Sequence, residues 1–210
     1  MKKMEFDLKG IKGVIHYVGN DFVVCCHGLY STKDSKKYVE MAELANDSGL
    51  SCIRFDFRGC GESKREFSFN LDDRVNDLKE VIDYIEKKFD DANYALFGSS
   101  FGGMVSLSYG SEDKVSSIAI LSTPSHVQFE GYEADIIPYA EKCSHVMIMH
   151  GLEDDMVPYQ HATAIYEKVK QPKKILFFNT DHSFSHRNER VKALNEAIKW
   201  FKRYFTSIQK

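Results

Sequence analysis

Short apolar runs alternate with longer segments of helical periodicity along most of this 210-residue chain. Continuous apolar runs of this length are typical of strands buried on both faces of a parallel sheet. A hairpin of two further strands is expected before them, formed by residues Met4–Leu8 and Gly13–Val18 around a turn-prone Lys9-Gly10. The expected buried strands are Phe22–Cys26, Ser51–Phe55, Tyr94–Phe97, Val115–Leu121, His145–Met149 and Lys174–Phe178.

The segments between these runs carry apolar residues three and four positions apart, which predicts amphipathic helices. They are Lys36–Asp47, Leu71–Phe89, Phe101–Tyr109, Tyr159–Val169 and Arg190–Phe205. Alternating strands and helices predict an α/β fold, a mostly parallel, doubly wound sheet of about eight strands with helices on both faces. No repeat or linker divides the chain, so we expect a single domain over residues 1–210.

Residues 123–142 break the alternation. They are too irregular for one helix and too apolar for a simple loop, so we expect a short lid-like insertion there. Phe129, Tyr132 and Tyr139 are its candidate substrate-binding residues, although packing of the lid onto the sheet is an equal alternative.

Charge, apolar runs and cysteine content argue against several classes of protein. The 28 Lys and Arg residues nearly balance the 31 Asp and Glu residues, giving a net charge of −3, which argues against nucleic-acid binding. The N-terminus lacks the apolar stretch of a secretory signal, and no run is long enough to span a membrane. Five cysteines, two of them adjacent, are typical of reduced thiols, so we expect a cytoplasmic protein. No long exposed apolar stripe suggests a large assembly, so we expect a monomer or small homo-oligomer.

The segment Gly98-Ser99-Ser100-Phe101-Gly102 follows a predicted strand and begins a predicted helix. A Gly-x-Ser-x-Gly sequence in this context is typical of a nucleophile elbow, a strained turn that points a serine hydroxyl out of the sheet. The alternative interpretation is a glycine-rich turn with a capping serine. We predict Ser100 as the nucleophile.

Two later strands also end in reactive side chains. The segment His150–Pro158 offers carboxylates directly after one strand, and Asn179–Phe184 offers the imidazole of His182 after the next. The chain order serine, acid, histidine is the order in which such a sheet assembles a catalytic triad.

A fourth strand end carries His27-Gly28-Leu29. Gly28 would let the Leu29 N–H, together with the Phe101 N–H, point at an oxyanion. The alternative is a plain glycine turn beside a packed His27.

These motifs together resemble the α/β-hydrolase superfamily, in particular its small, lightly lidded serine esterases, such as the cinnamoyl and feruloyl esterase-like and serine aminopeptidase-like groups. The matching segments cover most of the chain, in the expected order: HGL (27–29), DFRGCGES (56–63), GSSFGG (98–103), HGLEDDMVP (150–158) and DHSF (181–184). The resemblance implies Ser100 as nucleophile, His182 as general base and Asp154 as the acid, while Asp155 remains an alternative acid.

Other conspicuous residues have simpler interpretations. The DFRGCGES stretch is expected to be structural, with Asp56 and Ser63 bonding nearby backbone. Cys25 and Cys26 would point to opposite faces of one strand, so they are expected in the core and not at a metal. The basic run Lys33–Lys37 is expected to be a solvated helix start.

The expected activity is therefore hydrolysis of carboxylic esters with short-chain or aromatic acyl groups, through an acyl-enzyme and without a metal or organic cofactor. The expected partner is a small-molecule ester, with no nucleic acid and no membrane. A thioesterase, acyltransferase or small peptidase would use the same triad, and a catalytically silent binding protein would share the fold.

Overall fold

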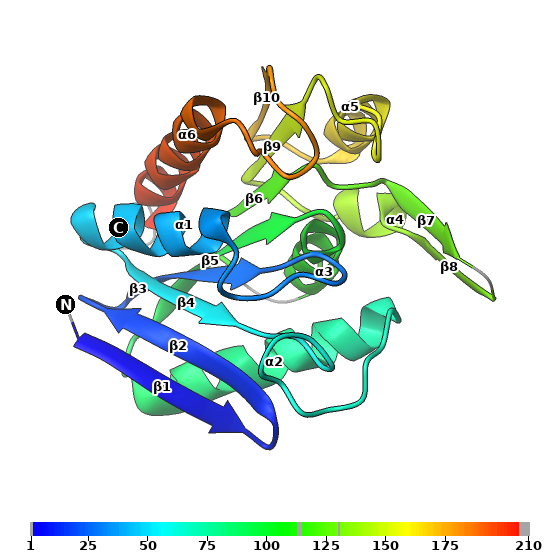
Figure 1. The fold of residues 1–210 in the computed structure, drawn as a ribbon. Coiled ribbons are helices and arrows are strands. Elements are labelled where there is room, and N and C mark those ends of the chain that lie inside the picture. Colours follow the sequence, from blue (N-terminus) through cyan, green and yellow to red (C-terminus); the bar gives the residue numbers. More distant parts are fainter. Residues whose placement is uncertain (1, 113–114, 130, 206–210) are drawn as a thin grey trace.

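The computed structural model describes residues 2–112, 115–129 and 131–205 (Figure 1). In chain order its elements are β1 (Lys2–Leu8), β2 (Ile11–Tyr17), β3 (Asp21–Cys26), α1 (Lys36–Asp47), β4 (Ser51–Phe55), α2 (Leu71–Lys88), β5 (Asn93–Ser99), α3 (Phe101–Gly110), β6 (Ile118–Leu121), β7 (His126–Phe129), β8 (Tyr132–Asp135), α4 (Ile137–Ala140), β9 (Val146–Gly151), α5 (Gln160–Lys168), β10 (Lys173–Phe178) and α6 (Arg187–Phe205).

Within the described ranges, eight strands form one twisted sheet in the order β1-β2-β4-β3-β5-β6-β9-β10 (Figure 1). The β1–β2 hairpin is antiparallel and joins the sheet through an antiparallel pairing of β2 with β4. All later neighbours pair in parallel, from β4 to β10. The predicted mostly parallel sheet and its opening hairpin are therefore confirmed.

Element boundaries differ from the predictions mainly at two places. The strand predicted over Val115–Leu121 begins only at Ile118. Helix α6 begins three residues before the predicted Arg190, because its first residues, Arg187–Glu189, are polar and carry no apolar periodicity.

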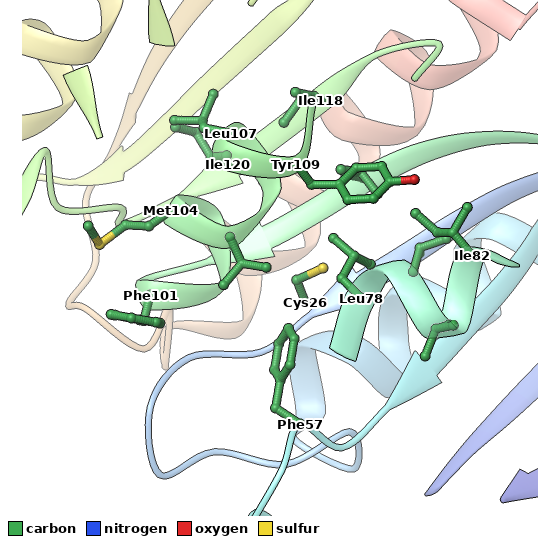
Figure 2. Packing of buried hydrophobic residues seen from close by; sticks show 14 of the residues in the cluster. Cys26, Phe57, Leu78, Ile82, Phe101, Met104, Leu107, Tyr109, Ile118 and Ile120 are labelled. Carbon is green, nitrogen blue, oxygen red and sulfur yellow. The ribbon is translucent and has the colours of Figure 1, made fainter. Parts of the chain in front are cut away.

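Helices cover both faces of the sheet and bury two apolar layers. Helices α1 and α6 pack on one face, and α2, α3 and α5 supply buried residues to the other. Strand β3 shows the division, because Cys25 belongs to the first layer and Cys26 to the second, where Figure 2 shows it beside Phe57 and Leu78. The prediction of two core thiols on opposite faces is confirmed.

Helix α3 is buried on all sides, unlike an ordinary surface helix. Glycines permit its close approach: a Cβ on Gly102 would lie 2.1 Å from the Cys26 carbonyl oxygen, and one on Gly98 would lie 2.4 Å from the Gly102 oxygen. The start of α3 is thus pressed against β3 and β5, which fixes the turn that precedes it.

The segment 123–142 forms a β7–β8 hairpin that extends from the body of the molecule, followed by the single turn of α4 (Figure 1). Ile136 and Ala140 are buried in the core, which explains why this segment is more apolar than a surface loop. The hairpin itself was not predicted, because its strands have only four residues each.

None of the helices in the described ranges has the length and apolar character needed to cross a membrane.

Candidate active site

Ser100 lies in the turn between β5 and α3, with a backbone φ of 55° and ψ of −126°. This region is unfavourable for a residue with a side chain, at a cost of order 1–3 kcal/mol. The Ser100 N–H donates to the Leu121 carbonyl at 2.8 Å, which ties the turn to β6. The strained turn therefore holds the hydroxyl in one orientation beyond the carboxyl end of the sheet.

A chain of hydrogen bonds joins three of the predicted residues. The Nε2 of His182 lies 3.1 Å from the Ser100 Oγ, and its Nδ1 lies 2.8 Å from the Asp154 Oδ2. His182 follows β10 and Asp154 follows β9, and these strands pair in parallel, so both loops emerge at the same edge. The structure thus brings Ser100, His182 and Asp154 together over a wide sequence separation.

The carboxylate of Asp154 is buried and fixed by its own loop. Its Oδ1 accepts hydrogen bonds from the N–H groups of Met156 at 3.1 Å and Val157 at 2.8 Å. Burial opposes ionisation, but the hydrogen bonds from His150, His182 and Val157 outweigh it and hold the pKa of Asp154 below its ordinary value. Asp155 is exposed, so the carboxylate that contacts His182 is that of Asp154.

His150, the last residue but one of β9, contacts the Asp154 carboxylate. Its ring is fully buried, with Nε2 lying 2.7 Å from the Val157 carbonyl oxygen and 3.3 Å from the Asp154 Oδ2. No role for His150 is predicted from the sequence. The available signal was its place at a strand end, four residues before the acid.

The two residues predicted to form the oxyanion hole, Leu29 and Phe101, line the same cleft as Ser100. Phe101 is the first residue of α3, so its N–H has no intrahelical acceptor. Gly28 lies against Ser100, since a Cβ on Gly28 would be 3.2 Å from the Ser100 Cβ. Any side chain at position 28 would therefore crowd Ser100.

His27 has a structural role. Its Nε2 accepts a hydrogen bond from the Phe57 N–H at 3.0 Å, so its Nδ1 donates to the Gly28 carbonyl oxygen at 2.7 Å. Burial lowers the pKa of His27 to about 4, and the ring is neutral. The packed-residue interpretation of His27 thus fits, and the ring fixes the loop that carries Leu29.

A cleft of 590 Å³ opens over Ser100 and His182. Its walls come from the β3–α1 loop, α1, the β7 strand and the α5 start, and it includes Leu29, Phe101 and Phe129. The other two candidate substrate-binding residues, Tyr132 and Tyr139, are not among the described residues that line the cleft. The Tyr132 hydroxyl instead accepts a hydrogen bond from the Leu71 N–H at 2.7 Å, and Tyr139 packs against the apolar core.

The prediction that Lys33–Lys37 is a solvated helix start holds for Asp34 and Lys36, which are exposed, but is wrong for Lys33 and Lys37. Lys33 is 4% exposed and its Nζ forms ion pairs with Asp34, Asp56 and Glu62. Lys37 lines the cleft, and its Nζ donates to the Ser99 Oγ at 2.9 Å. Lys33 contacts Asp56, which follows β4, and Lys37 contacts Ser99 at the end of β5, so both contacts are tertiary and charge spacing does not encode them.

The DFRGCGES stretch is structural, as predicted. The Asp56 Oδ1 accepts from the Lys33 N–H at 2.7 Å, and its Oδ2 accepts from the Glu62 N–H at 3.0 Å. The Ser63 hydroxyl donates to the Asp56 carbonyl oxygen at 2.6 Å. Gly61, with φ of 51°, packs directly on the Asp56 carboxylate.

Within the ranges that the structure describes, no cluster of three or more His, Cys, Asp or Glu residues is arranged to hold a metal ion.

Family models and curated proteins match parts of this sequence. The sequence model of the "alpha/beta hydrolase fold" family matches residues 21–137, and that of the "Prolyl oligopeptidase family" matches residues 121–207. The uncharacterized protein YfhR of Salmonella typhi is 26% identical over 165 residues, which cover 65% of this chain and 56% of YfhR. Protein phosphatase methylesterase 1 of Candida albicans is 32% identical over 85 residues, covering 40% of this chain and 23% of that protein. The match therefore spans little more than half of the first relative and less than a quarter of the second.

Two solved structures share the fold over nearly the whole chain. Est1E of Butyrivibrio proteoclasticus, solved with ferulic acid bound, has a TM-score of 0.78 at 21% identity, covering 99% of this chain and 100% of Est1E. The esterase PF2001 of Pyrococcus furiosus has a TM-score of 0.84 at 16% identity, covering 97% of this chain and 90% of the esterase.

Proposed function

The chain belongs to the alpha/beta hydrolase fold family, and from this premise we propose that it is a serine hydrolase that cleaves carboxylic esters. Ser100 is the nucleophile, His182 the general base and Asp154 the acid that orients His182. The observation that carries this proposal is the hydrogen-bond chain from Ser100 Oγ through His182 to Asp154, at the floor of an open cleft.

The proposed reaction has two stages. His182 accepts the Ser100 proton as Oγ attacks the ester carbonyl, and returns it to the departing alcohol, which leaves an acyl-enzyme. Water activated by His182 then releases the acid. The N–H groups of Leu29 and Phe101 stabilise the oxyanion in both stages, with each such donor contributing roughly 3 kcal/mol.

The cleft favours a small substrate with a short-chain or aromatic acyl group. Its volume of 590 Å³ is in the range of sites that enclose a small molecule. The segment 123–142 serves as a partial roof in this proposal, since His126 and Phe129 of β7 line the cleft. The ferulic acid complex of Est1E and the name of the Candida methylesterase are consistent with ester chemistry on this fold.

Labelling with a fluorophosphonate, which reacts with activated serines, tests this proposal. One stoichiometric adduct mapped to Ser100, absent in Ser100→Ala and retained in Ser99→Ala, is the expected result. A folded protein that takes up no label would overturn the proposal in favour of a catalytically silent binding protein.

A small peptidase is the second candidate, because the prolyl oligopeptidase family model matches residues 121–207, which include Asp154 and His182. A panel of oxygen esters, thioesters and aminoacyl amides separates the candidates. Hydrolysis of amides at a rate comparable with esters would favour the peptidase, while a preference for thioesters or transfer to an alcohol would identify a thioesterase or acyltransferase.

A further inference from the structure

The described residues that line the cleft carry an uncompensated positive charge. Lys37 is the one Lys or Arg among them, and none of them is Asp or Glu. A cleft lined by one sign of charge focuses its field and attracts ligands of the opposite sign.

Lys37 differs from the nearby Lys33 in the partners of its ammonium group. Lys33 forms ion pairs with Asp34, Asp56 and Glu62. For Lys37, no carboxylate in the described ranges forms an ion pair, and the hydrogen-bond acceptor of Nζ is the neutral Ser99 hydroxyl at 2.9 Å. An ammonium group has three N–H donors, so donors of Lys37 remain for a ligand.

The position of Lys37 also relates it to the proposed reaction. Ser99 precedes Ser100, and both line the cleft with Lys37. The ammonium group therefore contacts the residue directly before the proposed nucleophile. Burial lowers the pKa of Lys37 to about 8, against a smaller opposing effect of Asp181. A bound anion would offset that cost of burial.

We propose that Lys37 binds an anionic group of the substrate, a carboxylate within a few ångströms of the scissile ester, and so selects monoesters that carry a free acid. This inference rests on the proposed function and specifies its substrate class. The carboxylate belongs either to the acyl chain or to the alcohol, and the chemistry of recognition is the same in both cases.

Two matched substrate pairs test the proposal and separate these two sources. On the acyl side, 4-nitrophenyl hydrogen adipate is compared with 4-nitrophenyl hexanoate. On the alcohol side, 4-acetoxybenzoate is compared with 4-acetoxybenzamide. In each pair a neutral group replaces the carboxylate, so the ratio of kcat/KM for the charged to the neutral ester isolates the effect of charge.

Lys37→Met is expected to lower this ratio by about tenfold to a hundredfold in at least one pair, the loss typical of a hydrogen bond to a charged group. Lys37→Arg should retain most of the ratio, because the charge remains. Lys36→Met is the matched control, since Lys36 is the adjacent residue of α1, is exposed and does not line the cleft. The responding pair identifies which side of the ester carries the carboxylate.

An unchanged ratio in both pairs for Lys37→Met would overturn the proposal. A second measurement needs no variant: raising the ionic strength should lower kcat/KM of the wild-type protein for the charged ester more than for its neutral partner. Equal salt effects on both esters would contradict anion binding. Failure of the proposed function is distinguishable, because it would remove fluorophosphonate labelling and hydrolysis of the neutral esters as well.

Discussion

The Oδ2 of Asp154 lies 2.8 Å from the Nδ1 of His182, while the Oδ1 of the same carboxylate accepts two backbone N–H groups from its own loop. Both oxygens are therefore committed, and the carboxylate cannot rotate without breaking several bonds. A fixed acceptor at Nδ1 keeps the proton on that nitrogen and leaves the Nε2 free to accept the Ser100 proton. The pair thus selects the tautomer that the proposed reaction requires.

Asp154→Asn should lower kcat for ester hydrolysis by about 10⁴-fold, because the amide favours the wrong tautomer of His182 and no longer stabilises its cation. Steady-state kinetics on 4-nitrophenyl acetate measure the loss. Asp155→Asn is the matched control, since Asp155 is the exposed adjacent residue of the same loop. A larger loss in Asp155→Asn than in Asp154→Asn would contradict the assignment of the acid.

Ser100→Gly and Ser100→Ala should both be inactive but should differ in stability. Glycine accepts the φ of 55° and ψ of −126° at this position, whereas alanine keeps the strain. Relief of strain exceeds the entropic cost of glycine, so Ser100→Gly should be more stable than Ser100→Ala by about 1 kcal/mol. Urea unfolding of the two variants measures the difference, and equal midpoints would argue against a strained turn.

Gly102→Ala should destabilise the fold by about 2–3 kcal/mol, because overpacking forces backbone to shift. The added Cβ would lie 2.1 Å from the Cys26 carbonyl oxygen, so α3 would have to move away from β3. Gly19→Ala is the control, since nothing lies within 4 Å of a Cβ at that position. It should change the free energy of unfolding by less than about 0.5 kcal/mol. Similar losses in both variants would contradict the close approach of α3.

The preference for a charged ester should depend on pH through Lys37. Its ammonium is charged below its pKa and neutral above it, and burial lowers that pKa from 10.5 to about 8, with Asp181 and Asp154 raising it and Arg190 lowering it. The charged-to-neutral ratio of kcat/KM should therefore fall as the pH rises through about 8, since this parameter reports the free enzyme. Lys37→Arg should abolish the fall, because arginine stays charged. A wild-type ratio that is constant from pH 7 to about pH 10 would contradict the assignment to Lys37.

Local sequence determined the elements that position the site. The apolar runs predicted β3, β4 and β5 to within two residues, and the glycine spacing around Ser100 predicted the strand-to-helix turn. These features are encoded locally, because strand burial appears as a continuous apolar run and a strained turn with a close helix requires glycine. The position of His182 at a strand end followed from the same pattern.

Where two or more residues could perform the same chemistry, tertiary structure decided which of them does so. Asp154 and Asp155 are identical side chains in sequence, and only the loop conformation buries one against His182 and exposes the other. Tyr132 was a candidate substrate-binding residue with packing as an equal alternative, and in the structure its hydroxyl accepts a hydrogen bond from the Leu71 N–H.

The orientation of the β3–α1 loop could likewise not be predicted from the sequence. A basic run next to a helix start is usually solvated. Here the Lys33 ammonium group contacts Asp56 after β4, and the Lys37 ammonium group donates to Ser99 at the end of β5. The sequence by itself determined the layered sheet and the loops in which reactive residues lie, because those depend on short-range periodicity and turn chemistry. That Lys37 faces the cleft and Tyr132 does not was decided by contacts between residues far apart in the chain, which short-range patterns do not encode.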